Sequence, residues 1–226
     1  MKQSLQSLEA ELITCHRCPR LVAWREEIAQ TKRKAYQDQV YWGKPVPGFG
    51  DPRAKVMIVG LAPGAHGSNR TGRMFTGDAS GDFLYPALHK AGFANQPSGK
   101  FIDDDLQLHD VFITAVCRCV PPKNRPHVAE IRNCLPWLKR EIDLLPELKG
   151  YVALGRIAFD GLRRLYASEG EQLPSMTFGH NRLFELGQGK PWLLASYHPS
   201  QQNTLTGRLT TEMFDAIWNR VSKMIS

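Results

Sequence analysis

The chain has 226 residues, 42% of them hydrophobic, with a formal net charge of +7 and a sequence pI of about 9.3. This length and apolar content suit one large domain or two small ones, and charged residues interrupt every apolar run before it reaches the length of a membrane span. A basic surface favours a polyanionic partner such as nucleic acid, although many soluble proteins are mildly basic.

The cellular compartment can be inferred from the N-terminus and the cysteines. The stretch MKQSLQSLEAEL lacks the long apolar core of a signal peptide. The chain has five cysteines, and an odd number in an intracellular protein argues against a disulfide framework. We therefore expect a soluble, monomeric, cytoplasmic protein without membrane attachment, associated with the nucleoid if DNA is its partner.

The first quarter of the chain predicts two helices and a loop. Apolar residues recur on one side of residues 3–14, which predicts a helix. Residues 15–19 predict a turn, and the basic segment 20–37 predicts a second helix with one exposed face. Residues 41–55 are rich in Pro and Gly, which indicates a loop.

From residue 56 onward, strands and helices alternate. The expected strands are 56–60, 110–116, 151–154 and 192–197. The expected helices are 81–91, 130–145, 155–166 and 210–224, and Pro86 either kinks the first of these or lies in its first turn. This order predicts an α/β fold: a single domain with a central, mainly parallel sheet and helices on both faces.

Three loops of this predicted fold are candidates for a binding site. They follow the strands that end at Gly60, Val116 and Tyr197, and the first of them, in GLAPGAHGSNRTGRMFTGDASGDFL, is far longer than a plain connection requires. Ligands of parallel α/β folds bind at the carboxyl ends of the strands. We therefore expect the three loops to meet at one edge of the sheet.

The cysteines suggest a metal site. Cys15 and Cys18 form a C-x-x-C turn, and Cys119 and Cys134 flank a proline-containing loop further along the chain. Four thiolates suit either Zn²⁺ or an iron–sulfur cluster. The alternatives are buried, inert thiols or a thioredoxin-like redox pair, although that motif normally follows a strand. Cys117, at the end of a predicted strand, is interpreted as a packed thiol.

Together, GLAPGAHGSNRTGRMFTGD, SYHPSQQNTLTGRLT and these four cysteines resemble the type B (family 5) uracil-DNA glycosylases over nearly the whole chain. The resemblance implies a three-layer glycosylase fold over residues 1–226, with segment 1–50 tied to it by a [4Fe–4S] cluster on Cys15, Cys18, Cys119 and Cys134. It also implies hydrolysis of the N-glycosidic bond of uracil in DNA, and of other deaminated bases such as hypoxanthine, to leave an abasic site. No lysine is convincingly placed for lyase chemistry.

The resemblance also assigns roles to individual residues. His198 would hydrogen-bond the O2 atom of the departing base and stabilise its charge. Phe75 would stack on the base, and its alternative role is that of a core aromatic, against which the resemblance argues. Asp78 is the best candidate for a carboxylate that acts near the sugar, and its alternative role is the N-cap of the helix that follows. Asn124 is a possible assistant to Asp78.

The pocket around the base is expected to be broad. Ala115 stands where we align an asparagine of the type A enzymes, and Gly64 stands where many relatives carry a polar residue. The base-contacting positions that the resemblance implies are Gly60, Ala62, Pro63, Gly64, Phe75, Ala115 and Ser200. A wedge that enters the base stack is expected among Gln201, Gln202, Asn203 and Leu205.

Two other functions remain open at the level of sequence. One is a non-enzymatic, metal-stabilised nucleic-acid-binding module, which would not need His198 together with Phe75 and Asp78. The other is a glycosylase with strict specificity for uracil, against which Ala115 and Gly64 argue.

Overall fold

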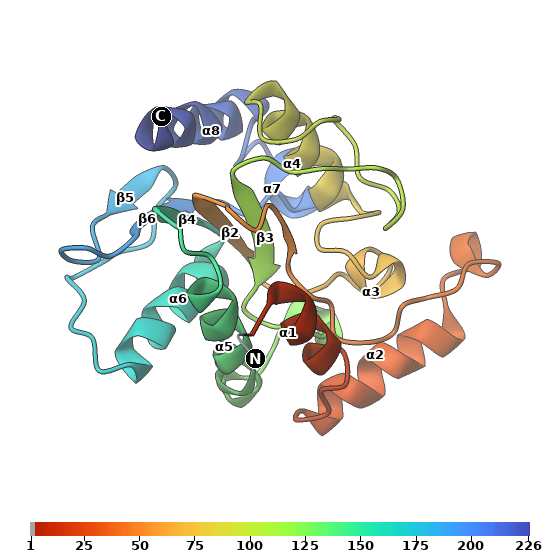
Figure 1. The fold of residues 1–226 in the computed structure, drawn as a ribbon. Coiled ribbons are helices and arrows are strands. Elements are labelled where there is room, and N and C mark those ends of the chain that lie inside the picture. Colours follow the sequence, from red (N-terminus) through yellow and green to blue (C-terminus); the bar gives the residue numbers. More distant parts are fainter. Residues whose placement is uncertain (1–2) are drawn as a thin grey trace.

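A six-stranded sheet forms the centre of the computed structural model, which describes residues 3–226 (Figure 1). The strands lie in the order β1-β3-β2-β4-β6-β5. They are β1 (Phe49–Gly50), β2 (Val56–Gly60), β3 (Val111–Ala115), β4 (Gly150–Leu154), β5 (Arg182–Phe184) and β6 (Trp192–Ser196). The central strands β3, β2, β4 and β6 pair in parallel, and the short edge strands β1 and β5 pair antiparallel. The mainly parallel sheet that the sequence predicts is confirmed.

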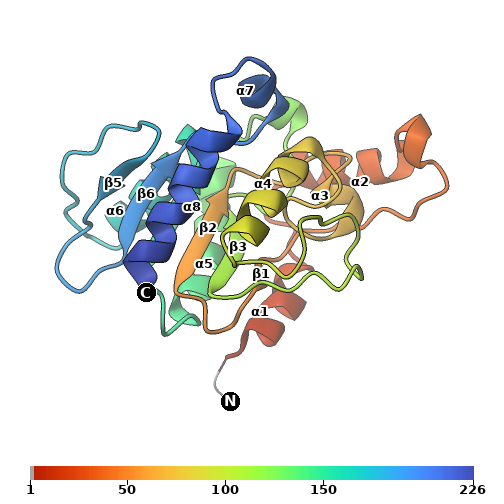
Figure 2. The ribbon, with the colours of Figure 1, turned by 90° about the horizontal axis from the view of Figure 1, so that it is seen from above.

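Helices cover both faces of the sheet (Figures 1 and 2). On one face lie α4 (Ala79–Lys90) and α8 (Thr211–Ile225), and on the other lie α5 (Val128–Asp143) and α6 (Arg156–Ser168). Successive side chains of a strand point to opposite faces. In β2, Ile58 therefore packs in the core with α4 and α8, and Met57 and Val59 pack in the core with α5 and α6. Within residues 3–226 no helix is both long enough and apolar enough to cross a membrane.

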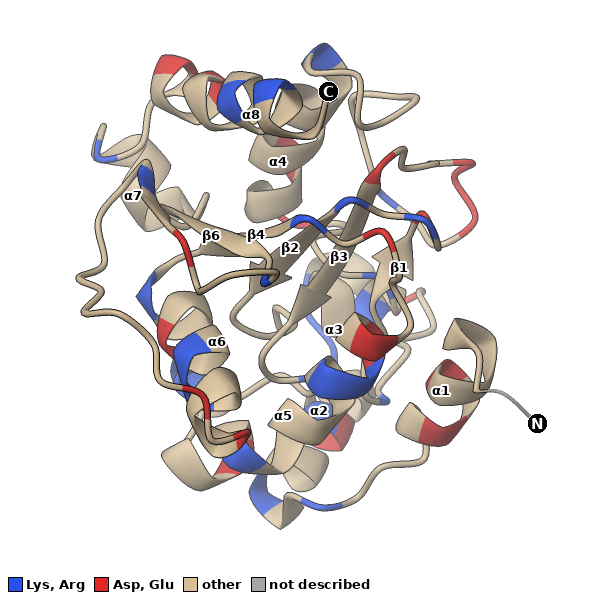
Figure 3. Ribbon diagram, turned by 60° about the vertical axis from the view of Figure 1, so that its left-hand side comes forward, with Lys and Arg blue, Asp and Glu red and all other residues tan. Residues whose placement is uncertain are grey.

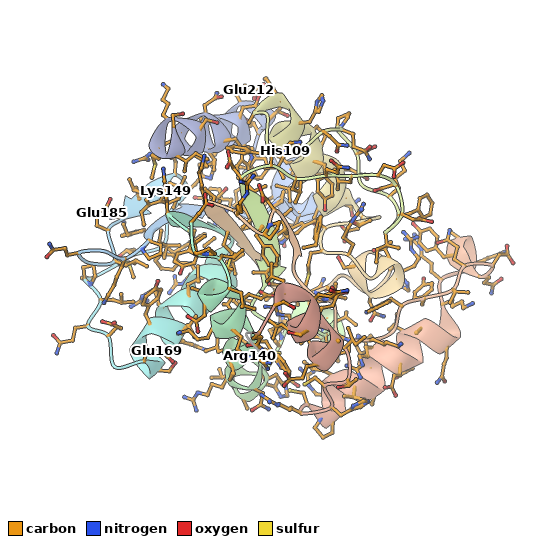
Figure 4. The ribbon with its side chains drawn as sticks, viewed as in Figure 1. His109, Arg140, Lys149, Glu169, Glu185 and Glu212 are labelled. Carbon is orange, nitrogen blue, oxygen red and sulfur yellow. The ribbon has the colours of Figure 1, made fainter. Side chains whose placement is uncertain are left out.

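The N-terminal helix α1 (Leu5–Leu12) packs on α5. Its Leu8 and Leu12 side chains are buried against Trp137 of α5. The Arg140 guanidinium of α5 pairs with the Glu11 carboxylate of α1, and Figure 4 labels Arg140 at this junction. Apolar contact and an ion pair thus hold α1 against the domain core.

The second helix is shorter than predicted. α2 (Pro19–Thr31) ends at Lys32, whose φ of 52° cannot continue a helix, and a separate 3₁₀ turn, η1 (Lys34–Tyr36), follows. The expected helix over 20–37 is therefore corrected to α2 and η1.

The predicted strands correspond to β2, β3, β4 and β6, and the four later helices to α4, α5, α6 and α8. Pro86 lies inside α4 and not in its first turn. The short elements β1, β5, α3 (Ser68–Thr71), η2 (Pro122–Asn124) and α7 (Gln201–Leu205) are not predicted, and β1 corrects the loop expected over 41–55. The edge strands exist because they pair with β3 and β6, which no local pattern reveals.

Candidate active site

A pocket opens where the carboxyl ends of the parallel strands meet. Its wall comes from the segment after β2, the turn around η2, the junction of β4 and α6, and the segment after β6. The lining residues are Leu61, Ala62, Gly64, Ser68, Met74, Phe75, Asp78, Ala79, Ser80, Asn124, Leu154, Gly155, Arg156, Ile157, His198, Ser200, Gln201 and Gln202. The expectation that three loops meet at one edge of the sheet is confirmed.

Phe75 and His198 stack on each other in this pocket. Their ring centroids are 5.7 Å apart and the ring planes are inclined by 28°. Phe75 also belongs to the apolar core and is 8% exposed, so it is both a core aromatic and a pocket wall. A Cβ atom on Gly60 would lie 2.9 Å from the Phe75 ring, so the ring occupies its place because residue 60 has no side chain.

The His198 imidazole is neutral at physiological pH. Burial lowers the pKa of His198 to about 4, because desolvation disfavours the imidazolium. The backbone of His198 is held by α7, since the Asn203 side-chain amide donates to the His198 carbonyl at 2.8 Å. A neutral imidazole carries one N–H, and here it can donate to charge that develops on a bound group.

We expect the low pKa of His198 to be visible by NMR. The His198 ring signals should keep their neutral positions as the pH falls to about 5 and titrate near pH 4. The spectrum of His198→Gln identifies these signals by their loss. Because the pKa in the folded state lies below that in the unfolded state, the native fold loses stability as the pH falls from about 6.5 to 4. A midpoint near 6.5 would show that the imidazole is not desolvated.

Asp78 combines two roles. Its Oδ1 atom accepts hydrogen bonds from the backbone N–H groups of Ser80 at 3.0 Å and Gly81 at 3.2 Å, which makes Asp78 the N-cap of α4. Its Oδ2 atom faces the loop backbone, where a Cβ on Gly67 would lie 2.1 Å away and one on Gly64 2.8 Å away. Burial raises the pKa of Asp78, although the two backbone N–H groups oppose the rise. One oxygen therefore caps the helix, and the other lies against the backbone of Gly64 and Gly67 in the segment that lines the pocket.

The predicted site residues separate into two layers. Ala62, Gly64, Phe75, Asp78, Asn124, His198 and Ser200 line the pocket. Gly60, Pro63 and Ala115 do not: Gly60 and Ala115 are paired in register on β2 and β3, and Ala115 packs in the same core as Phe75. The second layer supports the wall and does not form it. Asn124 is exposed at the rim with a positive φ of 55°.

The contribution of β4 to the pocket is not among the predictions from sequence. Leu154, Gly155, Arg156 and Ile157 line the pocket at the start of α6. The predicted parallel sheet contains the available signal, because every parallel strand ends at the same edge.

Arg70 holds the long loop after β2 in place. It is buried, and it donates to the carbonyl oxygens of His66 at 2.7 Å and Gly77 at 3.1 Å.

A second cavity brings together four of the cysteines. Cys15, Cys18, Cys119 and Cys134 all line it, between α1, α2 and α5. Cys117 is fully buried in the core on the α5 and α6 side of the sheet and is absent from this lining. The burial expected for Cys117 is confirmed, and its thiol lies within hydrogen-bond reach of the Cys134 thiol.

The donor set of this cavity fits a metal group. Two nitrogen donors already reach its sulfur atoms: Arg25 Nη1 lies 3.1 Å from the Cys119 sulfur, and Asn133 Nδ2 lies 3.4 Å from the Cys18 sulfur. Among residues 3–226, no group of three or more His, Cys, Asp or Glu side chains is arranged to hold a single metal ion. Four thiols that line one cavity are a donor set that suits either Zn²⁺ or an iron–sulfur cluster.

Comparison with known proteins agrees with this geometry. The profile of the uracil DNA glycosylase superfamily matches residues 47–222. The chain is 56% identical to a type-5 uracil-DNA glycosylase of Thermus thermophilus over 203 residues, which is 90% of each chain. It is 50% identical to a type-5 uracil-DNA glycosylase of Mycobacterium tuberculosis over 222 residues, 98% of this chain and 82% of that one. Identity to a type-4 uracil-DNA glycosylase of Pyrobaculum aerophilum is 34% over 170 residues, 75% of this chain and 69% of that one.

Proposed function

Because the chain belongs to the uracil DNA glycosylase superfamily and is most similar among these relatives to the type-5 enzymes, we propose that it excises uracil, and other deaminated bases, from DNA. The observation that carries this proposal is the pocket in which a neutral, buried His198 stacks on Phe75 beside the Asp78 carboxylate. A protein that only binds nucleic acid has no need of such a group. The reaction is hydrolysis of the N-glycosidic bond, and it leaves an abasic site.

The pocket can perform this reaction with four side chains. The target base leaves the duplex and enters the pocket, where the Phe75 ring offers a face on which it stacks. As the bond breaks, negative charge develops on the base, and the His198 N–H donates to its O2 atom. This donor acts in a site with little water, where such a bond has a large effect. The Oδ2 atom of Asp78 serves the sugar side, where positive charge develops and water attacks, with Asn124 at the rim.

The specificity should be broad. The wall beside Asp78 presents Gly64 and Ala62, and Ala115 packs in the same core as Phe75. None of these residues offers a polar side chain that could discriminate one base edge from another. We therefore expect hypoxanthine and xanthine to be accepted together with uracil.

An incision assay tests the function. Duplexes with a single uracil, hypoxanthine or xanthine are incubated with the protein, and the products are separated before and after treatment with alkali. Strand cleavage should appear only after alkali, because a glycosylase without lyase activity leaves the backbone intact. If the duplexes stay resistant to alkali after incubation, no base has been removed. This result would refute the proposal and favour a nucleic-acid-binding module without activity.

The four-cysteine cavity would hold a [4Fe–4S] cluster. Cys15, Cys18, Cys119 and Cys134 supply the thiolates, and when bound the cluster contributes an anionic centre and a covalent cross-link between distant parts of the chain. Two of these ligands lie in segment 1–50, and the cluster would tie that segment to the domain. No step of the hydrolysis requires the cluster.

Asp78→Asn should slow the excision of every base alike, by roughly a hundredfold, because the group acts on the sugar side. Asparagine is as good an N-cap as aspartate, so α4 should remain intact and the melting temperature unchanged. Single-turnover rates on uracil and hypoxanthine measure the effect. Asn124→Ala is the comparison, with a smaller loss. An unchanged rate in Asp78→Asn would limit Asp78 to its role as a cap.

DNA, as the proposed substrate, also accounts for the basic charge. Figure 3 shows Lys and Arg on several helices and loops, interspersed with Asp and Glu. Near the pocket, Arg156 lines the wall, and Lys123 and Arg125 are exposed on either side of Asn124. These side chains are placed to meet phosphates. We propose that the protein acts as a monomer in the cytoplasm, on the DNA of the nucleoid.

DNA affinity should fall steeply as salt rises, since each phosphate contact releases counterions. The slope of log affinity against log salt should become shallower by about one for each of Lys123→Ala, Arg125→Ala and Arg156→Ala. Fluorescence anisotropy with an abasic duplex measures it. Arg132→Ala, on the exposed side of α5, is the matched control. An affinity that is flat between low and moderate salt would count against DNA as the ligand.

A further inference from the structure

Three buried nitrogen atoms around the four-cysteine cavity have no hydrogen-bond partner within residues 3–226. They are Nε of Arg25, Nε of Arg118 and Nε1 of Trp137. The three residues are 1%, 1% and 3% exposed. Arg118 and Trp137 line the cavity, and Nη1 of Arg25 already donates to the Cys119 sulfur. Unpartnered buried donors are rare in native proteins, and three of them around one cavity indicate an acceptor inside it.

The two arginines differ in their charge balance. Both Nη atoms of Arg118 bind the Glu141 carboxylate, at 2.8 and 2.6 Å, and this ion pair is fully buried. The Arg118 charge is therefore neutralised within the fold. Among residues 3–226, the only ion pair of Arg25 is with Glu26, at 3.5 Å, and the Glu26 side chain is 47% exposed. Arg25 thus places a weakly compensated positive charge beside the cysteines.

We propose that Arg25 and Trp137 are outer partners of the cluster: the indole N–H donates to its sulfur atoms, and the buried guanidinium offsets its negative charge and raises its reduction potential. This inference rests on the iron–sulfur assignment of the proposed function. Thiolates and inorganic sulfides are both anionic acceptors. Positive charge and N–H donors stabilise the more negative, reduced state of a cluster over the oxidised one, so they shift its potential upward.

The decisive variant is Trp137→Phe in the iron-loaded, full-length protein. Phenylalanine keeps an aromatic ring for Leu8, Leu12 and the flanking guanidinium of Arg140, and it removes the N–H together with the five-membered ring of the indole, a loss of volume that the control variant must share. Trp218→Phe is the matched control. Trp218 also has a buried Nε1 without a partner, but it packs in the core with α4 and α8, on the other face of the sheet.

Two variants test the charge of Arg25. Arg25→Gln removes the charge and keeps a nitrogen donor, and Arg25→Lys keeps the charge. Iron content and visible absorbance are measured first for each protein. The reduction potential is then determined with chemical mediators that supply the electron, and the Fe–S stretching bands are recorded by resonance Raman spectroscopy. The Raman bands report hydrogen bonding to sulfur without any change of oxidation state.

The potential should shift to more negative values in Trp137→Phe and in Arg25→Gln, and it should stay close to the wild-type value in Arg25→Lys and Trp218→Phe. The Raman bands should shift in Trp137→Phe alone among the tryptophan variants. If the Raman bands and potential of Trp137→Phe match the wild type at full iron content, the proposal is wrong. This holds even where Arg25→Gln does not fold or where the cluster resists reduction, because the Raman comparison then decides.

The outcomes separate this inference from the proposed function. Wild-type protein that excises uracil but contains stoichiometric zinc, or no metal, refutes the cluster and the inference together and leaves the glycosylase activity standing. Full iron content with unshifted bands in Trp137→Phe refutes the inference alone. Excision rates of the loaded variants should equal that of the wild type, since neither side chain lines the base pocket.

Discussion

Replacing His198 by alanine should slow uracil excision by roughly a hundredfold to a thousandfold and leave DNA affinity almost unchanged. The reason is that the imidazole donates to charge that exists only in the transition state, so its loss raises the barrier without weakening ground-state binding. The low pKa of His198 strengthens the expectation. A neutral N–H group binds the uncharged carbonyl of the substrate weakly, and it binds the oxygen of the departing anion more strongly. Single-turnover rates at saturating enzyme, with affinities from anisotropy, measure the two quantities separately.

The effect of His198→Ala should depend on the base. Uracil leaves as an anion and depends on the O2 donor, whereas hypoxanthine can be protonated at a ring nitrogen and has a second route. The loss should therefore be larger for uracil than for hypoxanthine. His198→Gln retains an N–H donor and should recover part of the rate. Equal losses for both bases, together with an unaffected Asp78→Asn variant, would show that both assigned roles are wrong and would make Asn124 the next residue to test.

The parts of the fold that could be predicted from sequence are those with local causes. β2, β3, β4 and β6 are apolar runs buried on both faces of the sheet, and α5 and α8 have an apolar face of helical period. The end of α2 at Lys32 could not be predicted, because no Gly or Pro marks it. The edge strands β1 and β5 could not be predicted either, since their pairing partners lie far away in sequence.

The site could be predicted only in part, because some of its features also depend on segments that are far apart in the sequence. The motifs around Phe75, Asp78 and His198 identified the loops that form the pocket. They did not reveal that the two oxygens of Asp78 have different environments, because that depends on where the backbone of Gly64 and Gly67 passes. Nor did they separate Ala115, which packs in the same core as Phe75, from the residues that line the pocket. Whether a residue lines the pocket or lies behind its wall depends on tertiary packing, and the spacing of motif residues in the sequence does not show it.

The cysteines illustrate the same limit. The spacing of Cys15 and Cys18 predicted a pair of ligands, but nothing in the spacing of Cys119 and Cys134 placed them at the same cavity. The structure does so because β3 ends just before Cys119, and α5 then returns Cys134 to the same place. Cys117 lies two residues from Cys119 and packs into the core instead. Two positions that are two residues apart in sequence thus line the four-cysteine cavity and pack in the apolar core.

Packing alone and metal binding predict opposite orders for the loss of stability in Cys15→Ala and Cys117→Ala. Cys117 is fully buried and Cys15 is only half-buried, so by packing alone Cys117→Ala should cost more, about 1 kcal/mol. If Cys15 is a cluster ligand, its loss should instead remove the iron and destabilise the fold by more than about 4 kcal/mol, because metal binding is coupled to folding.

The two variants are purified anaerobically and compared by iron content, visible absorbance and denaturant unfolding. We expect Cys117→Ala to be brown, loaded with iron and nearly as stable as the wild type, and Cys15→Ala to be colourless and far less stable. A colourless wild-type protein with one bound zinc would be consistent with the assigned ligands and would exclude the cluster. Retention of iron by Cys15→Ala together with its loss from Cys117→Ala would show that the assigned ligand set is wrong, because the thiol taken as core packing would then be the one that binds the metal.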